Sequence, residues 1–300
     1  MSEHSLSYLD AAKVYRELDA LMAIPPLRLC KTAMDSYLRW FNEQCTRSKA
    51  MTDEAKTFIP GGVQHNLAFN YPFPLVIDRS EGPYLYDIDG HRYIDFLQAG
   101  GPTILGGNDP TVREQVMEVL KRVGPSTGLF HEFELKLARE INRHIPSVEM
   151  FRMLGSGTEA VMAAVRVARL ATRKRKVIKI GGAYHGWSDQ VVYSLKIPHT
   201  RRFEAHGIPR AATRQTREAA PNDLGSLERV LRANRLAGGT ACVLIEPVGP
   251  ESGTRPVDFG YNAGVRRLCD RYGALLVFDE VVTAFRVGLG GAQGFFGVRP

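Results

Sequence analysis

Four short motifs in the 300-residue chain carry groups that could do chemistry, and the first is Gly155-Ser156-Gly157-Thr158-Glu159-Ala160. It follows a predicted strand and opens a predicted helix. Free backbone N–H groups at a helix start, together with the hydroxyls of Ser156 and Thr158, could bind an anion such as a phosphate. The same pattern is also typical of an ordinary helix N-cap. No Gly-Lys-Ser/Thr follows, which excludes a Walker loop.

The second motif, Gly181-Gly182-Ala183-Tyr184-His185-Gly186-Trp187, also comes just after a predicted strand. Glycines here would let the backbone approach a ligand closely. Tyr184 offers a flat ring that could stack on a planar group. His185 could be a ligand, a base or a packed loop residue, and the motif alone does not distinguish these roles.

The third and fourth motifs each place a carboxylate at the end of a predicted strand, Glu246 before Pro247 and Asp279 after Phe278. A buried carboxylate is costly unless a cation or hydrogen-bond donors meet it. We therefore expect a positive partner for Asp279, either an arginine such as Arg286 or the protonated nitrogen of a heteroaromatic ligand. Two acids after two such strands would also suit a magnesium ion.

Alternating strand and helix patterns would position these motifs. The predicted strands cover residues 150–154, 176–180, 190–195, 240–245 and 274–278, and the predicted helices cover residues 158–172, 223–234 and 263–272. This alternation predicts an α/β fold with a mainly parallel sheet covered by helices. Ligands of such sheets bind beyond the carboxyl ends of the strands, where all four motifs fall.

The first third of the chain has a different pattern. Residues 1–58 read as helical, with two amphipathic stretches at 6–22 and 33–45. Residues 59–109 read as rich in strands, with a short strand at 75–77 and a hairpin at Asp89-Gly90. Two further helices are predicted at 111–123 and 132–144. We therefore expect three parts, with boundaries after residues 58 and 109.

Composition excludes several classes of protein. Apolar residues make up 44% of the chain and charged residues 24%, which excludes a disordered or fibrous chain. The longest apolar runs are far shorter than the roughly 20 residues of a membrane helix. Residues 1–10 have no core of a secretory signal, so we expect a cytoplasmic protein without membrane partners. Four widely spaced cysteines without a CxxC pair predict reduced thiols and no metal site.

The net charge of +7 is concentrated in residues 166–217. Nucleic-acid binding is one interpretation of such a stretch. The basic residues are not interleaved with stacking aromatics, however. We therefore expect a solvated face or a funnel toward an anionic ligand, and no nucleic-acid partner.

Taken together, the motifs resemble those of the class-III pyridoxal-phosphate-dependent aminotransferases of fold type I, most closely the glutamate semialdehyde aminomutase branch. The resemblance runs from about residue 57 to residue 300. It depends on the order of Pro60-Gly61-Gly62-Val63, Asp87 to Asp95, Pro146 to Met150, Ser156 to Ala160, Tyr184-His185-Gly186, Glu246-Pro247, and Leu275 to Val281.

The resemblance implies a mainly parallel, seven-stranded type of sheet flanked by helices, incomplete here. Residues 110–300 would then be most of the large domain that binds pyridoxal phosphate, and residues 59–109 a β-rich part of the small domain with the entry to the large one. The implied cofactor-binding residues are Ser156, Gly157, Thr158, Tyr184, His185, Glu246, Asp279 and Val281.

Within this set the resemblance gives the phosphate to Ser156, Gly157 and Thr158, and places Tyr184 against the pyridine ring. Asp279 would be the catalytic residue. Its carboxylate would pair with the protonated ring nitrogen and keep the ring cationic, so that the ring can accept an electron pair released from the substrate.

Two departures from the family pattern affect the expected activity. The lysine that binds the cofactor covalently is expected about 28 residues after Asp279, beyond Pro300. We therefore expect a truncated sequence that is inactive alone. The alternative is a non-catalytic protein that lacks the cofactor-binding lysine. The arginine that the aminomutase branch often has after Pro-Gly-Gly-Val is missing from residues 64–69, where His65 could contact the substrate instead.

We therefore expect an aminotransferase that moves an amino group from a small amino donor to an oxo acid or aldehyde through the pyridoxamine form of its cofactor. A glutamate-semialdehyde-type 2,1-aminomutase is the alternative within the family. The resemblance also implies a homodimer with sites at the interface, in which residues 100–102 and 126–128 lie near the partner.

Overall fold

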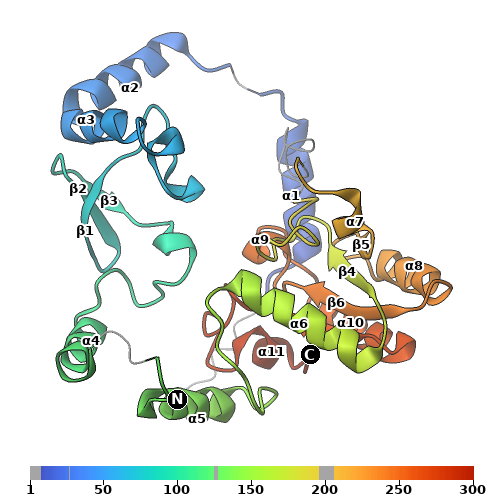
Figure 1. Ribbon diagram of the computed structural model, residues 1–300. Coiled ribbons are helices and arrows are strands. Elements are labelled where there is room, and N and C mark those ends of the chain that lie inside the picture. Colours follow the sequence, from blue (N-terminus) through green and yellow to red (C-terminus); the bar gives the residue numbers. More distant parts are fainter. Residues whose placement is uncertain (1–7, 27, 125–127, 196–205) are drawn as a thin grey trace. The chain divides into compact units, whose positions relative to one another are not determined.

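The computed structural model describes residues 8–26, 28–124, 128–195 and 206–300 (Figure 1). The chain forms two compact units. The first consists of Met1–Ala23 with His131–Pro300, and the second is Ile24–Phe130. The domain boundaries expected after residues 58 and 109 remain predictions about the whole protein.

The first unit is built around a four-stranded parallel sheet with the strand order β5-β4-β6-β7. Every residue of the inner strand β6 is buried, as is usual in parallel sheets covered on both faces. This confirms the predicted α/β fold with a parallel sheet. The strands are β4 (Lys176–Ile180), β5 (Thr216–Ala219), β6 (Thr240–Ile245) and β7 (Leu275–Phe278).

Helices cover both faces of this sheet, and the alternation of side chains along the strands decides which helix each residue meets. Val243 and Ile245 of β6 belong to one cluster with α8 (Leu224–Arg235) and α10 (Tyr261–Tyr272). Their neighbours Cys242 and Leu244 belong to the other cluster, with Val161 and Val165 of α6 (Gly157–Thr172). The layers are therefore helix, sheet, helix (Figure 1).

Five further helices belong to the described part of the first unit. Tyr8, just before α1 (Ala11–Ala23), anchors this end of the chain to the rest of the first unit. Its hydroxyl donates to the carbonyl of Val257 at 2.7 Å, and its ring contacts the ring of Phe296. The helices are α1 (Ala11–Ala23), α5 (Glu132–His144), α7 (Arg210–Thr213), α9 (Pro250–Gly253) and α11 (Gly291–Phe296).

Two predicted strands are wrong. Residues 150–154 form no strand in the structure, and Met150 is 93% exposed. A strand needs a neighbour to satisfy its backbone groups, and no described strand pairs with this segment. Residues 190–195 form a turn and an irregular stretch instead, because the buried ammonium of Lys179 takes the carbonyls of Val191 (2.8 Å) and Tyr193 (2.5 Å).

The second unit contains an antiparallel sheet with the strand order β1-β2-β3. The predicted hairpin is confirmed by the pairing of Tyr86 with Arg92. The strand predicted at residues 75–77 overlaps β1 only at Ile77, where β1 begins. The residues that pair with β2 are Ile77 and the polar residues after it, so pairing and not the apolar run sets the limits of this strand. The strands are β1 (Ile77–Glu81), β2 (Tyr84–Asp87) and β3 (Arg92–Ile94).

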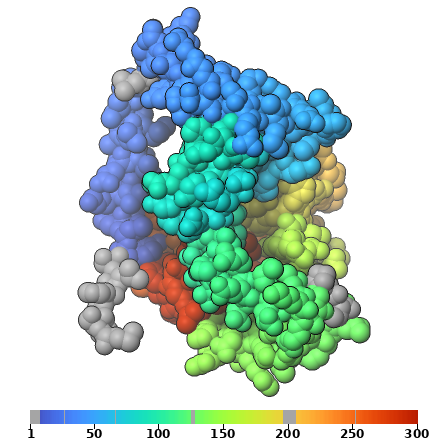
Figure 2. Space-filling model, turned by 90° about the vertical axis from the view of Figure 1, so that its left-hand side faces the viewer, coloured from blue at the N-terminus to red at the C-terminus, as the bar shows by residue number. Residues whose placement is uncertain are grey.

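The helices α2 (Lys31–Gln44) and α3 (Thr46–Ala55) adjoin this sheet; Figure 2 shows them in blue beside the strands in cyan. Asp89, in the hairpin turn, fixes the start of α3 because its carboxylate accepts from the backbone N–H groups of Arg47 (2.8 Å) and Ser48 (3.0 Å). In the described residues no helix is long and apolar enough to cross a membrane. The unit contains α2 (Lys31–Gln44), α3 (Thr46–Ala55), α4 (Pro110–Val123) and three short 3₁₀ turns at Pro60–Gly62, Asn66–Ala68 and Gln98–Gly100.

Candidate functional site

The start of α6 already attracts an anionic group. Ser156 is the N-cap of α6, and its Oγ accepts from the backbone N–H of Glu159 at 3.2 Å. The same hydroxyl donates to Oε2 of the Glu159 carboxylate at 3.0 Å. That oxygen lies so near Gly155 that a Cβ there would approach it to 2.7 Å. The free N–H groups and the helix dipole favour negative charge at this point, which is the property expected of a phosphate site.

The loop after β4 lies against this helix start. The backbone N–H of Trp187 donates to Oγ1 of Thr158 at 3.1 Å. Gly186 has a φ of +88°, and a Cβ there would come within 2.5 Å of the same Oγ1, so only glycine fits. Tyr184 precedes this contact, and 48% of the residue is exposed, so that its ring is accessible to a ligand.

Glu246, which follows β6, fixes the backbone of two loops. Its Oε1 accepts from the N–H of Tyr184 at 3.0 Å and from the N–H of Glu251 at 3.2 Å. The carboxylate thus joins the loop after β4 to the first turn of α9 (Pro250–Gly253). This matches a role in holding the surroundings of a ligand, while Tyr184 presents the ring.

Asp279, directly after β7, is held by three hydrogen bonds and its side chain is only 7% exposed. Its backbone N–H donates to the carbonyl of Ile245 at 2.8 Å, and its Oδ1 accepts from the N–H of Val281 at 3.1 Å. Its Oδ2 lies 2.8 Å from Nδ1 of His185. Since a carboxylate can only accept, Nδ1 carries the proton.

His185 is therefore the partner that the structure gives to Asp279. The residue is buried, and its other ring nitrogen, Nε2, has no hydrogen-bond partner among the described residues. The sequence left the role of His185 open and named Arg286 as a candidate partner of Asp279. In the structure, Nε of Arg286 donates to the carbonyl of Val282 at 3.3 Å.

Val281 and Glu280 extend the loop after β7 in two directions. The side chain of Val281 reaches the start of α6, where a Cβ on Gly157 would meet it at 3.0 Å. The carboxylate of Glu280 accepts instead from the N–H groups of Ala292 (2.6 Å) and Gln293 (3.2 Å), at the beginning of α11. Glu280 is thus a structural residue of the loop, which the sequence did not reveal because the N–H groups that donate to it lie a dozen residues away.

The three segments 155–158, 184–187 and 279–281 therefore meet at the carboxyl edge of the sheet. The magnesium alternative receives no support from the side chains there. Among the described residues, the one cluster of three or more metal-ligating side chains lies elsewhere, at Cys45, Asp87 and His91.

His65 belongs to the second unit, so its predicted contact with the substrate is not tested. The residue is exposed, and its Nδ1 accepts from the N–H of Leu67 at 3.1 Å. Of the segments expected near a partner subunit, residues 100–102 are described, whereas residues 126 and 127 lie outside the described residues.

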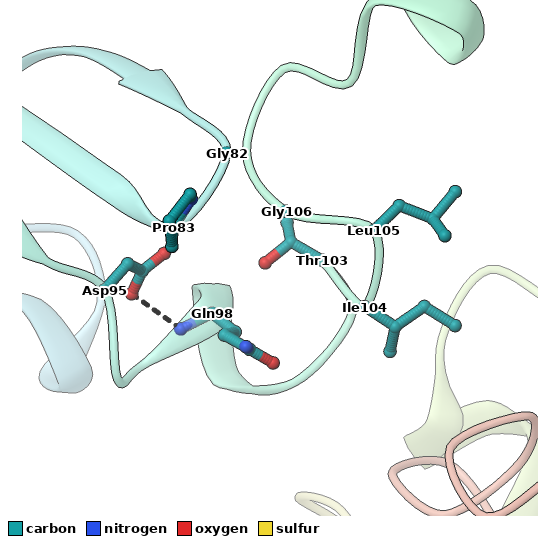
Figure 3. A pocket seen from close by; sticks show the side chains of 8 residues that line it. All are labelled: Gly82, Pro83, Asp95, Gln98, Thr103, Ile104, Leu105 and Gly106. Carbon is teal, nitrogen blue, oxygen red and sulfur yellow. Dashed lines mark hydrogen bonds between the residues drawn. The ribbon is translucent and has the colours of Figure 1, made fainter.

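A pocket of about 270 Å³ opens in the second unit (Figure 3). Its one acidic side chain, Asp95, accepts from the backbone N–H groups of Leu97 (3.0 Å) and Gln98 (2.8 Å). None of the site residues predicted from the sequence lines it. The pocket is lined by Gly82, Pro83, Asp95, Gln98, Thr103, Ile104, Leu105 and Gly106.

Comparison with known proteins gives one family and many similar structures. A family model described as "Aminotransferase class-III" matches residues 67–300. The "Glutamate-1-semialdehyde 2,1-aminomutase 1" of Lachnoclostridium phytofermentans is 41% identical over 265 residues, which cover 85% of this chain and 60% of that protein. The chain thus spans about 60% of the length of the curated relatives that it matches.

Two solved structures are similar over most of the chain. A "Transaminase with PLP bound" has a TM-score of 0.77 at 32% identity, covering 85% of this chain and 59% of the other. An omega-transaminase from Sphaerobacter thermophilus has a TM-score of 0.78 at 29% identity, covering 87% of this chain and 60% of the other.

Proposed function

Because this chain belongs to the class-III aminotransferase family, we propose that the whole protein moves an amino group from a small amino donor to an oxo acid or aldehyde, with pyridoxal phosphate as its cofactor. The observation that carries this proposal is the meeting of a helix start, an exposed aromatic ring and a buried carboxylate at one edge of the sheet.

The described residues fit this cofactor. The helix start at Ser156 to Thr158 offers N–H groups and hydroxyls to a phosphate, and the position of the Glu159 carboxylate supports its preference for anions. At Gly186 a Cβ would clash with Thr158, so glycine allows the loop after β4 to pack directly against the helix start. When bound, pyridoxal phosphate supplies an aldehyde that reacts with amines and a ring that accepts electrons.

The residues of this chain would divide the work as follows. Ser156, Gly157 and Thr158 hold the phosphate, and Tyr184 lies against the ring. Asp279 keeps a proton on the ring nitrogen, because its carboxylate is withdrawn from water and favours a cationic partner. His185 is a positioning residue, since its Nδ1–H directs the carboxylate of Asp279. Glu246 holds the backbone of Tyr184, and Val281 lies beside Gly157 at the same edge.

A 2,1-aminomutase is the second candidate, because the relatives at 37–43% identity carry that name. An aminomutase moves the amino group within one molecule, whereas an aminotransferase moves it between two. Nitrogen labelling separates these outcomes. The full-length protein, loaded with pyridoxal phosphate, is incubated with ¹⁵N-labelled amino donors and unlabelled oxo acceptors, and separately with glutamate-1-semialdehyde.

We expect ¹⁵N in the product formed from the acceptor, detected by mass spectrometry. Isomerisation of glutamate-1-semialdehyde without transfer to any added acceptor would favour the aminomutase. If neither reaction occurs in a protein that retains bound cofactor, the proposal is overturned and a non-catalytic protein is favoured. Asp279→Asn serves as the inactive control.

We further propose a cytoplasmic homodimer with the sites at its interface. The four free cysteines support a reducing location. The dimer is an expectation from the family resemblance, and residues 100–102 would lie near the partner. Sedimentation velocity of the full-length protein at micromolar concentration should give a species of twice the subunit mass. A monomer throughout this range would contradict it.

A further inference from the structure

Three side chains of different chemistry gather in the second unit: Cys45, Asp87 and His91. Their potential ligand atoms, a sulfur, a carboxylate oxygen and a ring nitrogen, all lie within 4.8 Å of one another. We propose that these residues form a binding site for a thiophilic divalent cation, with Zn²⁺ as the expected occupant. This inference does not depend on the proposed enzymatic function.

The backbone fixes all three positions. Cys45 is the single residue between α2 and α3 and is fully buried. Asp87 ends β2, and His91 follows the hairpin turn, so that the backbone N–H of His91 donates to Oδ1 of Asp87 at 2.8 Å. Asp89 joins the two segments through its hydrogen bonds to the start of α3. Secondary structure therefore fixes the backbone on both sides of the cluster, the helices at Cys45 and the hairpin at Asp87 and His91.

The ligand atoms need only a small adjustment to take up a metal. Nδ1 of His91 already lies 2.9 Å from Oδ2 of Asp87. In a tetrahedral zinc site with bonds of roughly 2.0 to 2.3 Å, neighbouring ligand atoms are about 3.3 to 3.7 Å apart. Since no two ligand atoms are more than 4.8 Å apart, the widest separation exceeds this range by about 1 Å at most, which side-chain rotation can close.

The charges also balance. A thiolate and a carboxylate together carry two negative charges and neutralise a divalent cation, while a neutral imidazole supplies the third ligand. Binding would release the proton of the Cys45 thiol to solvent. The proton of His91, now on Nδ1 beside the Asp87 carboxylate, would move to Nε2 through solvent so that Nδ1 can bind the metal. The His91 side chain is 27% exposed, which gives the cation a route from solvent and leaves room for a water as fourth ligand. One sulfur and one nitrogen favour zinc over magnesium or calcium.

A network of hydrogen bonds without metal is the competing explanation. The carboxylate of Asp87 accepts from His91 and, at 2.8 Å, from the hydroxyl of Tyr93, so it is already satisfied. In that case Asp87 only joins the strands of the hairpin. The two explanations differ in whether the folded protein takes up a thiophilic cation through Cys45.

Cobalt titration of the full-length protein tests the proposal, because Co²⁺ bound to a thiolate gives a near-ultraviolet charge-transfer band. The protein is first freed of metal with a chelator. We expect one equivalent of Co²⁺ to produce the band and Zn²⁺ to remove it. Cys45→Ser should abolish the band and weaken binding by roughly 10-fold or more. The matched control, Cys30→Ser, changes the exposed cysteine just before α2 and should leave the band unchanged.

A second readout does not depend on the stability of a cysteine variant. The ring of Trp40 lies 5.3 Å from the ring of His91, so bound Co²⁺ should quench Trp40 fluorescence in the wild-type protein, and His91→Gln should reduce the quenching. Absence of both band and quenching in the folded wild-type protein would overturn the proposal. So would a band that survives Cys45→Ser but disappears in Cys30→Ser.

Discussion

Asp279 and Glu280 are adjacent carboxylates with different surroundings. Asp279 meets an imidazole and a backbone N–H at the carboxyl edge of the sheet. Glu280 meets the N–H groups that begin α11. Their chemistry is the same, so their tasks differ only because the loop directs one toward the candidate site and the other away from it.

Asp279→Asn should lower the turnover of the full-length enzyme by at least about 100-fold, in the range seen when one electrostatic partner of the transition state is lost. A neutral amide cannot hold a proton on the ring nitrogen, while the phosphate contacts proposed for Ser156 and Thr158 would remain. Some cofactor should therefore stay bound. Steady-state kinetics and the cofactor absorbance after dialysis measure the two effects separately.

Asp270→Asn is the matched control, because Asp270 is an exposed carboxylate of the same unit, paired with Arg266 on α10. Its turnover should remain near that of the wild type. Wild-type rates in Asp279→Asn would refute the role given to Asp279.

The four cysteines should differ sharply in reactivity at neutral pH. The Thr32 hydroxyl, 3.1 Å from Cys30, lowers the pKa of this exposed thiol. Burial raises the pKa of Cys242 to about 11 and that of Cys269 to about 12. Burial, together with the charges of Asp87 and Asp89, also raises the pKa of Cys45. Because the thiolate is the reactive form, Cys30 should react first.

Alkylation followed by peptide mass spectrometry checks this order. Cys30 should be modified in the native protein, and the other three cysteines only after unfolding in denaturant. Rapid native labelling of Cys242 or Cys269 would contradict the buried positions that the structure gives them.

At the scale of elements, the sequence predicted the strands that have their own apolar run. The runs at 176–180 and 240–245 are strands with the same limits as β4 and β6. β5 was missed because Thr-Arg-Glu-Ala has no apolar run, and its strand geometry comes from pairing with β4. Residues 150–154 were overpredicted because an apolar run does not make a strand without a neighbour.

The candidate site shows the same limit. Each motif could be found from its own residues and its place after a strand. The contact of His185 with Asp279 could not, because 94 residues separate them and only the order of the strands brings their loops together. The cluster of Cys45, Asp87 and His91 was likewise invisible, since no short spacing joins the cysteine to the other two ligands.

Glu280→Gln should destabilise the loop between β7 and α11. Each oxygen of the carboxylate accepts from a different N–H, Oε2 from Ala292 and Oε1 from Gln293. A glutamine offers one acceptor and places a donor where the second was, so one N–H loses its partner. We expect the free energy of unfolding to fall by roughly 1 to 3 kcal/mol, measured by urea denaturation of the full-length protein.

Glu17→Gln is the control, because the one ion pair that Glu17 forms with the described residues is exposed, with Lys13 on α1 at 3.8 Å. This change should alter the free energy of unfolding by about 0.5 kcal/mol or less. Equal effects of the two substitutions would show that Glu280 does not hold the start of α11.

At the scale of the whole molecule, the buried apolar residues are distributed unevenly. The two described core clusters both belong to the first unit and lie on opposite faces of one sheet. The sheet of the second unit is far more exposed: four of the five residues of β1 and two of the three residues of β3 are open to solvent. Stability should therefore differ between the units, because local opening costs least where few apolar contacts are lost.

Hydrogen exchange should display this difference directly. The amides of β6 lie between β4 and β7 in a strand that is buried throughout, so exchange there requires the parallel sheet to open. The amides of β1 and β3 sit in the outer strands of a three-stranded sheet and need only local fraying. In the full-length protein we expect peptides covering β6 to exchange at least about 10-fold more slowly than those covering β1 or β3. Mass spectrometry after timed exposure to deuterium gives both rates in one experiment. Slower exchange in β1 and β3 than in β6 would mean that the second unit is stabilised by contacts beyond those within its own residues.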